Sequence, residues 1–236
     1  ISLNDLLVAP NKYCTYVCSI CHPLEHFHRY LQYGYYPFYL EGRQQYYDRV
    51  ENVINYIVDV ELTKNRALEI GNTQKVKALL QVISEMAPYE VDIAKLSKST
   101  GISRPSTLKY LIYMEEAKLI RRLFTKRHNI TDLQKPEKIY LDNTNLLYTL
   151  CTNTPETGTI RETFFANQVA AANHIIEYAG FKKGDFRIDD NLVFEIGGAD
   201  KGFSQLSGQS NSFVAADGIE SSTPGKIPLW TFGFLY

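Results

Sequence analysis

Three carboxylates in the last third of the chain have the residue types that a divalent cation needs. Glu162 is expected at the start of a helix, Asp185 at the start of a strand, and Glu195 at the end of the next strand. Mg²⁺ prefers oxygen ligands and keeps several waters, and such a cation activates water against a phosphodiester. The alternative is that each acid is a surface charge or, for Glu162, a group favoured by the helix dipole.

A second candidate set consists of basic and hydroxyl side chains near the middle of the chain. Residues 75–138 contain 13 Lys and Arg against 7 Asp and Glu, whereas the remainder contains 12 against 19. Basic groups neutralise phosphates, and hydroxyls bond phosphate oxygens or base edges. The candidate DNA contacts are Arg104, Ser106, Thr107, Lys109, Arg122, Lys126 and Arg127. The alternative is a basic face that packs only against protein, including the acidic flanks.

A third set is the cysteine motif C-x3-C-x2-C formed by Cys14, Cys18 and Cys21, with His22 beside it. Radical SAM enzymes use this spacing for an iron–sulfur cluster, and three thiols with a histidine also suit zinc. The sequence that follows does not alternate strand and helix as a radical SAM barrel requires. The three cysteines also share one face of a helix, and Cys is among the most buried residue types. We therefore predict packing rather than a metal site.

The elements that position the basic set are three helices and a β-hairpin. Apolar residues recur at helical spacing over 76–83, Asp92 caps a second helix, and Ser103 caps a third that presents the basic residues outward. Two strands follow, at 119–125 and 138–141. This order is typical of a winged helix-turn-helix.

The flanking segments complete an α+β multidomain chain. Residues 1–70 read as mostly helical, with residues 63–73 as the predicted linker. Residues 146–236 read as a helix followed by short strands. The predicted helix covers 162–178, and the predicted strands cover 185–188, 192–196, 212–216 and 227–234. The predicted domains are 1–70, 71–145 and 146–236.

Several strings resemble one protein family. Residues 27–38 resemble the F-x-x-Y-L-x-x-G-x-Y-P segment in the lid region of a bacterial AAA+ ATPase family common in Bacteroidetes. Further strings resemble that family's C-terminal domain of unknown function, which is similar to PD-(D/E)xK nucleases. They lie at 161–168, 184–186, 194–198 and 227–236. The resemblance implies a lid-like remnant, a winged helix and a small α/β nuclease-like domain.

Two departures limit what the resemblance implies. The chain has no G-x-x-x-x-G-K-[ST] phosphate loop, so we expect the C-terminal part of a longer protein, whose N-terminal ATPase core would bind ATP and Mg²⁺. By resemblance, Asp185, Glu195 and Glu162 match the acids of the nuclease motif, but its lysine position falls on Gly197. Lys201 would have to leave the strand to replace it. Losing one such charge costs about 10²–10³ in rate, so we predict a degenerate site.

The sequence therefore predicts an accessory region that docks DNA or a protein partner through a winged helix, with no cofactor of its own. Sparse cysteines indicate a cytoplasmic location, and no apolar run approaches the roughly 20 residues of a membrane helix. One alternative is a Mg²⁺-dependent nuclease acting on DNA. Another is a purely structural protein-interaction module.

Overall fold

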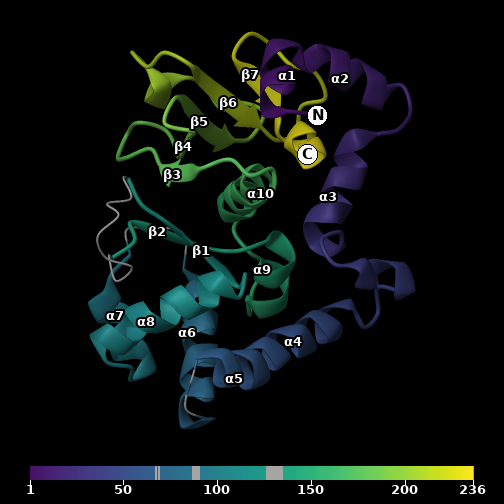
Figure 1. Ribbon diagram of the computed structural model, residues 1–236. Coiled ribbons are helices and arrows are strands. Elements are labelled where there is room, and N and C mark those ends of the chain that lie inside the picture. Colours follow the sequence, from purple (N-terminus) through teal and green to yellow (C-terminus); the bar gives the residue numbers. More distant parts are fainter. Residues whose placement is uncertain (67, 69, 87–90, 126–134, 236) are drawn as a thin grey trace. The chain divides into compact units, whose positions relative to one another are not determined.

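The computed structural model describes residues 1–66, 68, 70–86, 91–125 and 135–235. Helices and two separate sheets make this an α+β protein, as predicted (Figure 1). The chain divides into two compact units. A terminal unit combines residues 1–31 with residues 157–236, and a central unit covers residues 32–156. None of the helices in the described ranges has the length and apolar character needed to cross a membrane.

The central unit is mainly helical, with one two-stranded antiparallel sheet formed by β1 and β2. Its elements, in chain order, are η1 (Pro37–Glu41), α4 (Tyr46–Tyr56), the π-helical η2 (Ile57–Glu61), α5 (Leu62–Arg66), η3 (Ile70–Asn72), α6 (Thr73–Glu85), α7 (Ile93–Thr100), α8 (Arg104–Glu116), β1 (Ile120–Leu123), β2 (Lys138–Leu141) and α9 (Thr144–Leu150). The order from α6 to β2 is the order that the sequence predicted for this segment.

Local hydrogen bonds set the ends of α7 and α8. The carboxylate of Asp92 accepts from the N–H groups of Ala94 and Lys95 at 2.8 and 3.1 Å. These N–H groups hold the pKa of Asp92 below its usual range. Gly101 adopts a left-handed φ of 66° and ends α7, as a glycine without a Cβ readily does. The Ser103 hydroxyl then accepts from the N–H of Ser106 and caps α8, so the predicted caps are confirmed.

A buried polar cluster joins three segments of the central unit. Asn145 on α9 is fully buried, and its Oδ1 accepts from the Tyr35 N–H at 2.8 Å and from the Tyr46 hydroxyl. The Tyr46 hydroxyl in turn accepts from the N–H of Tyr36 at 3.2 Å. A buried polar group needs such a partner, because an unsatisfied one costs its full desolvation. This cluster therefore fixes α4 and residues 35–36 against α9.

The terminal unit is built on a five-stranded sheet in the order β3-β4-β5-β6-β7. The β3–β4 and β4–β5 pairs are antiparallel, while the β5–β6 and β6–β7 pairs are parallel. The helices are α1 (Leu3–Val8), α2 (Pro10–Cys18), α3 (Pro23–Tyr33, which runs into the central unit) and α10 (Thr157–Ala171). The strands are β3 (Ile176–Tyr178), β4 (Phe186–Ile188), β5 (Leu192–Gly197), β6 (Ser212–Ala216) and β7 (Lys226–Pro228), and the 3-10 helices are η4 (Ser204–Leu206) and η5 (Leu229–Phe234).

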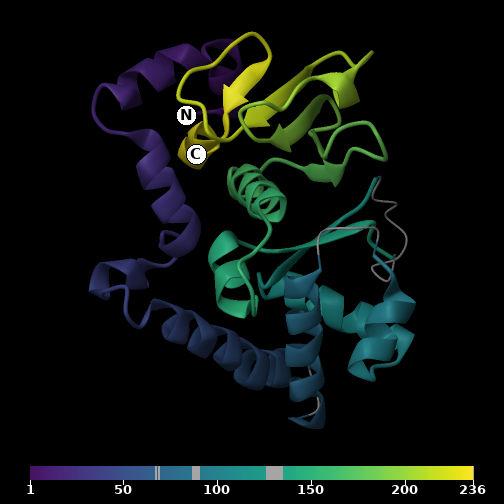
Figure 2. The ribbon, with the colours of Figure 1, turned by 180° about the vertical axis from the view of Figure 1, so that it is seen from behind.

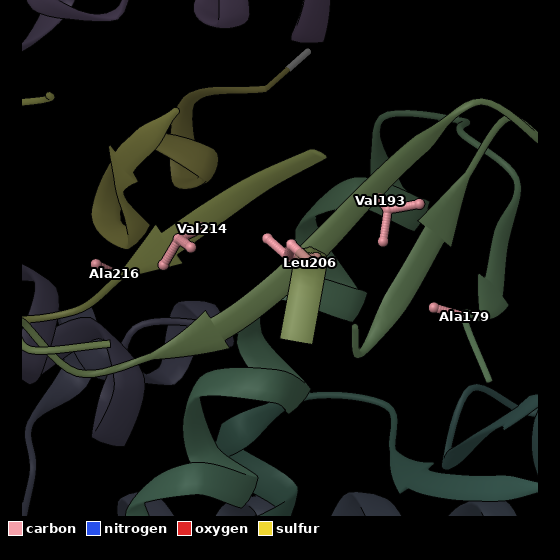
Figure 3. Packing of buried hydrophobic residues seen from close by; sticks show 5 residues of the cluster. All are labelled: Ala179, Val193, Leu206, Val214 and Ala216. Carbon is pink, nitrogen blue, oxygen red and sulfur yellow. The ribbon is translucent and has the colours of Figure 1, made fainter. Parts of the chain in front are cut away.

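The two faces of this sheet are covered differently. On one face, α10 packs through Phe165 against Phe186 and Phe194, with ring centroids 5.3 and 5.0 Å apart; both ribbon views show α10 against the sheet (Figures 1 and 2). The other face carries a small cluster of buried apolar residues (Figure 3). Its members are Ala179, Val193, Leu206, Val214 and Ala216. Adjacent residues of β5 and β6 therefore serve opposite sides of the sheet, because side chains alternate along a strand.

Two predicted elements end earlier than the sequence suggested. The helix predicted over 162–178 stops at Ala171, because Asn173 takes a left-handed φ of 65°, a common helix end. Residues 176–178 then pair with β4 as an edge strand. The strand predicted over 227–234 is limited to β7, and residues 229–234 form a 3-10 helix. Pro228 explains this ending, since proline cannot donate to a strand ladder.

The predicted domain boundaries do not coincide with the two compact units. The predicted linker, 63–73, contains α5 and η3, and its residue Leu68 is buried within the central unit. The boundary at 145 falls inside α9. Residues 1–31 pack with the C-terminal segment instead: Asn11 exchanges two hydrogen bonds with the backbone of Ser222, at 3.1 and 2.8 Å. Such long-range contacts leave no signature in local composition.

The buried cluster around Asn145 provides a test of the central unit. Tyr46→Phe removes only a hydroxyl, leaving the Tyr36 N–H without its acceptor and Asn145 with one donor fewer. We expect the free energy of unfolding to fall by about 1–3 kcal/mol, measured by denaturant unfolding. The control is Tyr56→Phe at the other end of α4, where the side chain is 57% exposed. Equal effects of the two substitutions would contradict the role assigned to the cluster.

Candidate functional site

The sheet brings two of the three predicted carboxylates together. Phe186 pairs with Phe194, and the N–H of Asp185 donates to the Phe194 carbonyl at 2.8 Å. Asp185 therefore lies opposite Glu195 on the neighbouring strand. The Asp185 carboxylate accepts from the N–H of Ile196 at 2.8 Å. Because Phe194 faces α10, alternation turns Glu195 to the opposite face of the sheet.

The side chain of Lys201 lies next to Gly197, the position at which the sequence analysis predicted a missing lysine. The N–H of Lys201 donates to the Gly198 carbonyl at 3.0 Å, so residues 198–201 form a tight turn back over the strand. A Cβ at Gly197 would lie only 2.6 Å from the Cβ of Lys201. The Lys201 ammonium forms an ion pair with Glu195, whose side chain is 1% exposed. An amine therefore lies beside Glu195, and the turn at residues 198–201 brings it there.

The third predicted carboxylate, Glu162, lies on a helix rather than on a strand of the sheet. Glu162 is in the second turn of α10, which begins at Thr157, so the prediction that Glu162 starts the helix is wrong. Helix α10 covers the face away from Glu195. Within the described residues no three His, Cys, Asp or Glu side chains are grouped to hold a metal ion. Lys201 pairs with Glu195, and one carboxylate oxygen of Asp185 accepts from the N–H of Ile196 at 2.8 Å.

On the α10 side, the structure gathers charged residues that sequence reasoning did not select. Arg161 Nε donates to Asp217 Oδ2 at 2.9 Å, and His28 Nε2 lies 3.5 Å from the other carboxylate oxygen, Oδ1. Asp217 directly follows β6 and is 6% exposed. The sequence gives one sign of this cluster, which is that Asp217 directly follows an apolar strand. Its partners come from segments more than fifty residues away, and no local pattern identifies them.

The predicted DNA contacts on α8 divide into exposed and buried side chains. Arg104 and Lys109 are exposed and Ser106 is half-buried, so these three are available at the surface. Thr107 is fully buried and its hydroxyl donates to the Ser103 carbonyl at 3.0 Å. The prediction that Thr107 faces outward is therefore wrong. It packs within the helical core because it lies on the same side of α8 as buried Leu111.

Arg122 was also predicted to contact DNA, but its side chain does not lie at the surface. It is buried, and its Nε and Nη2 donate to Glu115 Oε2 at 2.9 and 2.7 Å. Its neighbour Arg121 pairs with Asp142 at 2.9 Å. These guanidinium groups therefore hold β1 to α8 and to the end of β2. The candidates Lys126 and Arg127 lie outside the described residues.

The cysteines do not share one buried face. Cys14 on α2 is buried, and burial raises the pKa of its thiol to about 11. Cys18, the last residue of α2, is exposed, and Cys21 beyond the helix is partly buried. The prediction that all three pack inward therefore holds for Cys14 alone. The pKa of Cys18 is also raised, first by partial burial and then by Glu220, which disfavours the thiolate that binds metals.

Comparison with known proteins assigns the chain to a family. Residues 24–157, more than half of the chain, match the model of a domain of unknown function (DUF8612). The chain therefore belongs to this family, and the matched segment includes the whole central unit. No curated protein and no solved structure matches the chain.

The Lys201–Glu195 pair gives a prediction for the terminal unit. Lys201→Met removes the ammonium from a carboxylate that is 1% exposed. Because breaking a buried pair leaves an uncompensated charge, we expect a loss of about 2–4 kcal/mol of stability, less than for a fully buried lysine. Adding Glu195→Gln should restore most of it, as measured by denaturant unfolding. The exposed Lys183→Met serves as the control, and a harmless Lys201→Met would argue against a structural role for the pair.

Proposed function

We propose that the chain is the accessory region of a AAA+-type ATP-binding protein and that its central unit contacts DNA through a winged helix. The observation that carries the proposal is a group of exposed basic side chains on α7 and α8, within the predicted helix order. Arg104 and Lys109 lie on α8, and Lys95 and Lys98 lie on α7. Exposed cations on this pair of helices are positioned to neutralise phosphates.

The positions of the neighbouring groups support this assignment. Lys135 and Arg104 add to the backbone N–H groups that lower the pKa of Asp92. Cations that precede β2 and begin α8 therefore lie close to the first turn of α7. The ammonium of Lys109 lies 5.5 Å from the centre of the Tyr113 ring, a cation–π contact that leaves it accessible. With Thr107 and Arg122 buried, the basic surface offers mainly phosphate contacts.

DNA binding is tested with the whole chain and duplex DNA at several salt concentrations. We expect affinity to fall steeply with salt, and Arg104→Ala and Lys109→Ala each to reduce the salt slope by about 1. The matched control is Lys64→Ala, which removes an exposed lysine from α5 of the same unit. Absence of binding even at low salt would reject DNA as the partner. It would favour the alternative of a protein-interaction module.

For the terminal unit we propose a nuclease-like scaffold that no longer cuts DNA. The supporting observations are the ion pair of Glu195 with Lys201 and the hydrogen bond from the Ile196 N–H to the Asp185 carboxylate. An active nuclease remains the second candidate, because Lys201 supplies an amine next to Glu195. ATP and Mg²⁺ would act in the parent protein, since this sequence lacks a phosphate loop. The sparse cysteines support a cytoplasmic location for that protein.

A DNA cleavage assay distinguishes the two proposals for the terminal unit, an inactive scaffold and an active nuclease. We expect the purified chain to leave single- and double-stranded DNA intact with either Mg²⁺ or Mn²⁺, because the Lys201 ammonium engages the Glu195 carboxylate. Products are measured by denaturing gel electrophoresis. Metal-dependent cleavage that disappears in Glu195→Gln would establish the nuclease instead. Cleavage that survives this substitution would indicate a contaminant.

A further inference from the structure

A cavity of about 210 Å³ lies within the terminal unit. Its walls come from the end of α2, from α3, from α10 and from η5. The lining therefore combines side chains between residues 17 and 30 with side chains between residues 164 and 234. Segments this far apart in the sequence enclose a space only when the unit is folded.

The inner wall of this cavity consists of aromatic rings. Phe27, Phe164 and Trp230 are all buried. The rings of Phe27 and Phe164 meet edge to face, with their centroids 4.8 Å apart. The indole nitrogen of Trp230 donates to the Ile219 carbonyl at 3.1 Å, so the polar atom of this ring is engaged by the backbone. The inner wall therefore presents aromatic carbon to a ligand.

The cavity reaches the surface of the terminal unit beside Phe234. This residue lines the cavity and is 41% exposed, and its ring lies edge to face with Trp230 at a centroid distance of 6.1 Å. Two further lining residues are accessible, since Cys21 is half-buried and His26 is exposed. A buried aromatic base below an accessible rim is the usual form of a small-molecule site.

The volume and the lining together define the class of ligand. An apolar cavity of about 150 Å³ binds benzene, so a volume of about 210 Å³ accommodates two fused aromatic rings. The described lining residues include no Asp or Glu, and a cation buried without a carboxylate would be costly. A flat, uncharged molecule can instead make the offset and edge contacts that aromatic rings prefer.

We propose that this cavity binds an uncharged aromatic molecule of two fused rings, of the size of indole. The rings of the ligand pack against Phe27, Phe164 and Trp230, and its edge faces the rim at Phe234. The lining includes neither Glu195 nor Lys201, so the site is separate from the carboxylates of the sheet. It is also independent of DNA contact by the central unit.

The test is a titration of the whole nitrogen-15-labelled chain with unlabelled indole. Trp230 is the only tryptophan in the sequence, so its side-chain N–H gives a single resonance at the cavity wall. We expect a saturable shift of this resonance. Cys21→Phe adds an aromatic ring to the lining and should weaken binding by roughly 10- to 100-fold, the effect of excluding one buried ring. The control is Cys18→Phe at an exposed cysteine one helical turn earlier, which should leave the affinity unchanged.

A second variant, Phe234→Ala, decides the question where Cys21→Phe destabilises the unit. It removes a ring from the rim and should weaken binding about 3- to 10-fold, the contribution of one aromatic contact. Its control is Phe181→Ala, which removes a ring that is 75% exposed outside the cavity. Absence of saturation, or full affinity in both Cys21→Phe and Phe234→Ala, would overturn the proposal. Tetramethylammonium binding more tightly than indole would overturn the choice of an uncharged ligand and point to a cation held by aromatic rings.

Discussion

The parallel pairing of β5 with β6 is the constraint on which the terminal unit depends. Its register sets Gly197 beside Ala216, so the chain leaves both strands at one edge. Since successive side chains face opposite sides of a sheet, the same pairing separates two buried acids. Glu195 points away from α10 and Asp217 points toward it. A slip of one residue in either strand would turn that strand's acid to the other face, away from its partner.

Buried and half-buried carboxylates explain why several cations in this protein are structural. Glu195 holds Lys201, and Glu115 and Asp142 hold Arg122 and Arg121. A charge removed from water is tolerated when it is paired and hydrogen-bonded. Basic residues next to buried acids are therefore committed to the fold. Those on the outer sides of α7 and α8 are exposed and remain available to a partner.

Arg161 pairs with a buried acid and is also partly exposed. Its Nε is committed to Asp217, whereas its two terminal nitrogens lie near Gly198, where a Cβ would be 3.4 and 3.6 Å away. An ion pair that uses only part of a guanidinium both stabilises the unit and holds the remaining donors still. Lys201 differs because its three donors share one nitrogen, which lies against Glu195. The difference follows from the chemistry of the side chains, since guanidinium has five donors in a fixed plane.

Aromatic contacts hold the sheet of the terminal unit to α10 and to η5. The strand framework is held by stacked rings, with Phe165 contacting Phe186, Phe194 and Phe232. None of these contacts depends on the charged residues. The charged pair on the other face, Glu195 with Lys201, adds to these apolar contacts.

By itself, the sequence determined the features that depend on local hydrogen bonds and spacing. The caps of α7 and α8, the left-handed Gly101 and the apolar face of α6 follow from residues a few positions apart. Several strands were also evident from alternation. The tertiary structure alone decided that residues 1–31 join the C-terminal sheet, that Lys201 turns back to Glu195 and that Asp217 meets Arg161. The reason is physical: capping and periodicity act within one or two turns, whereas ion pairs and strand register are chosen by burial, which the whole fold sets.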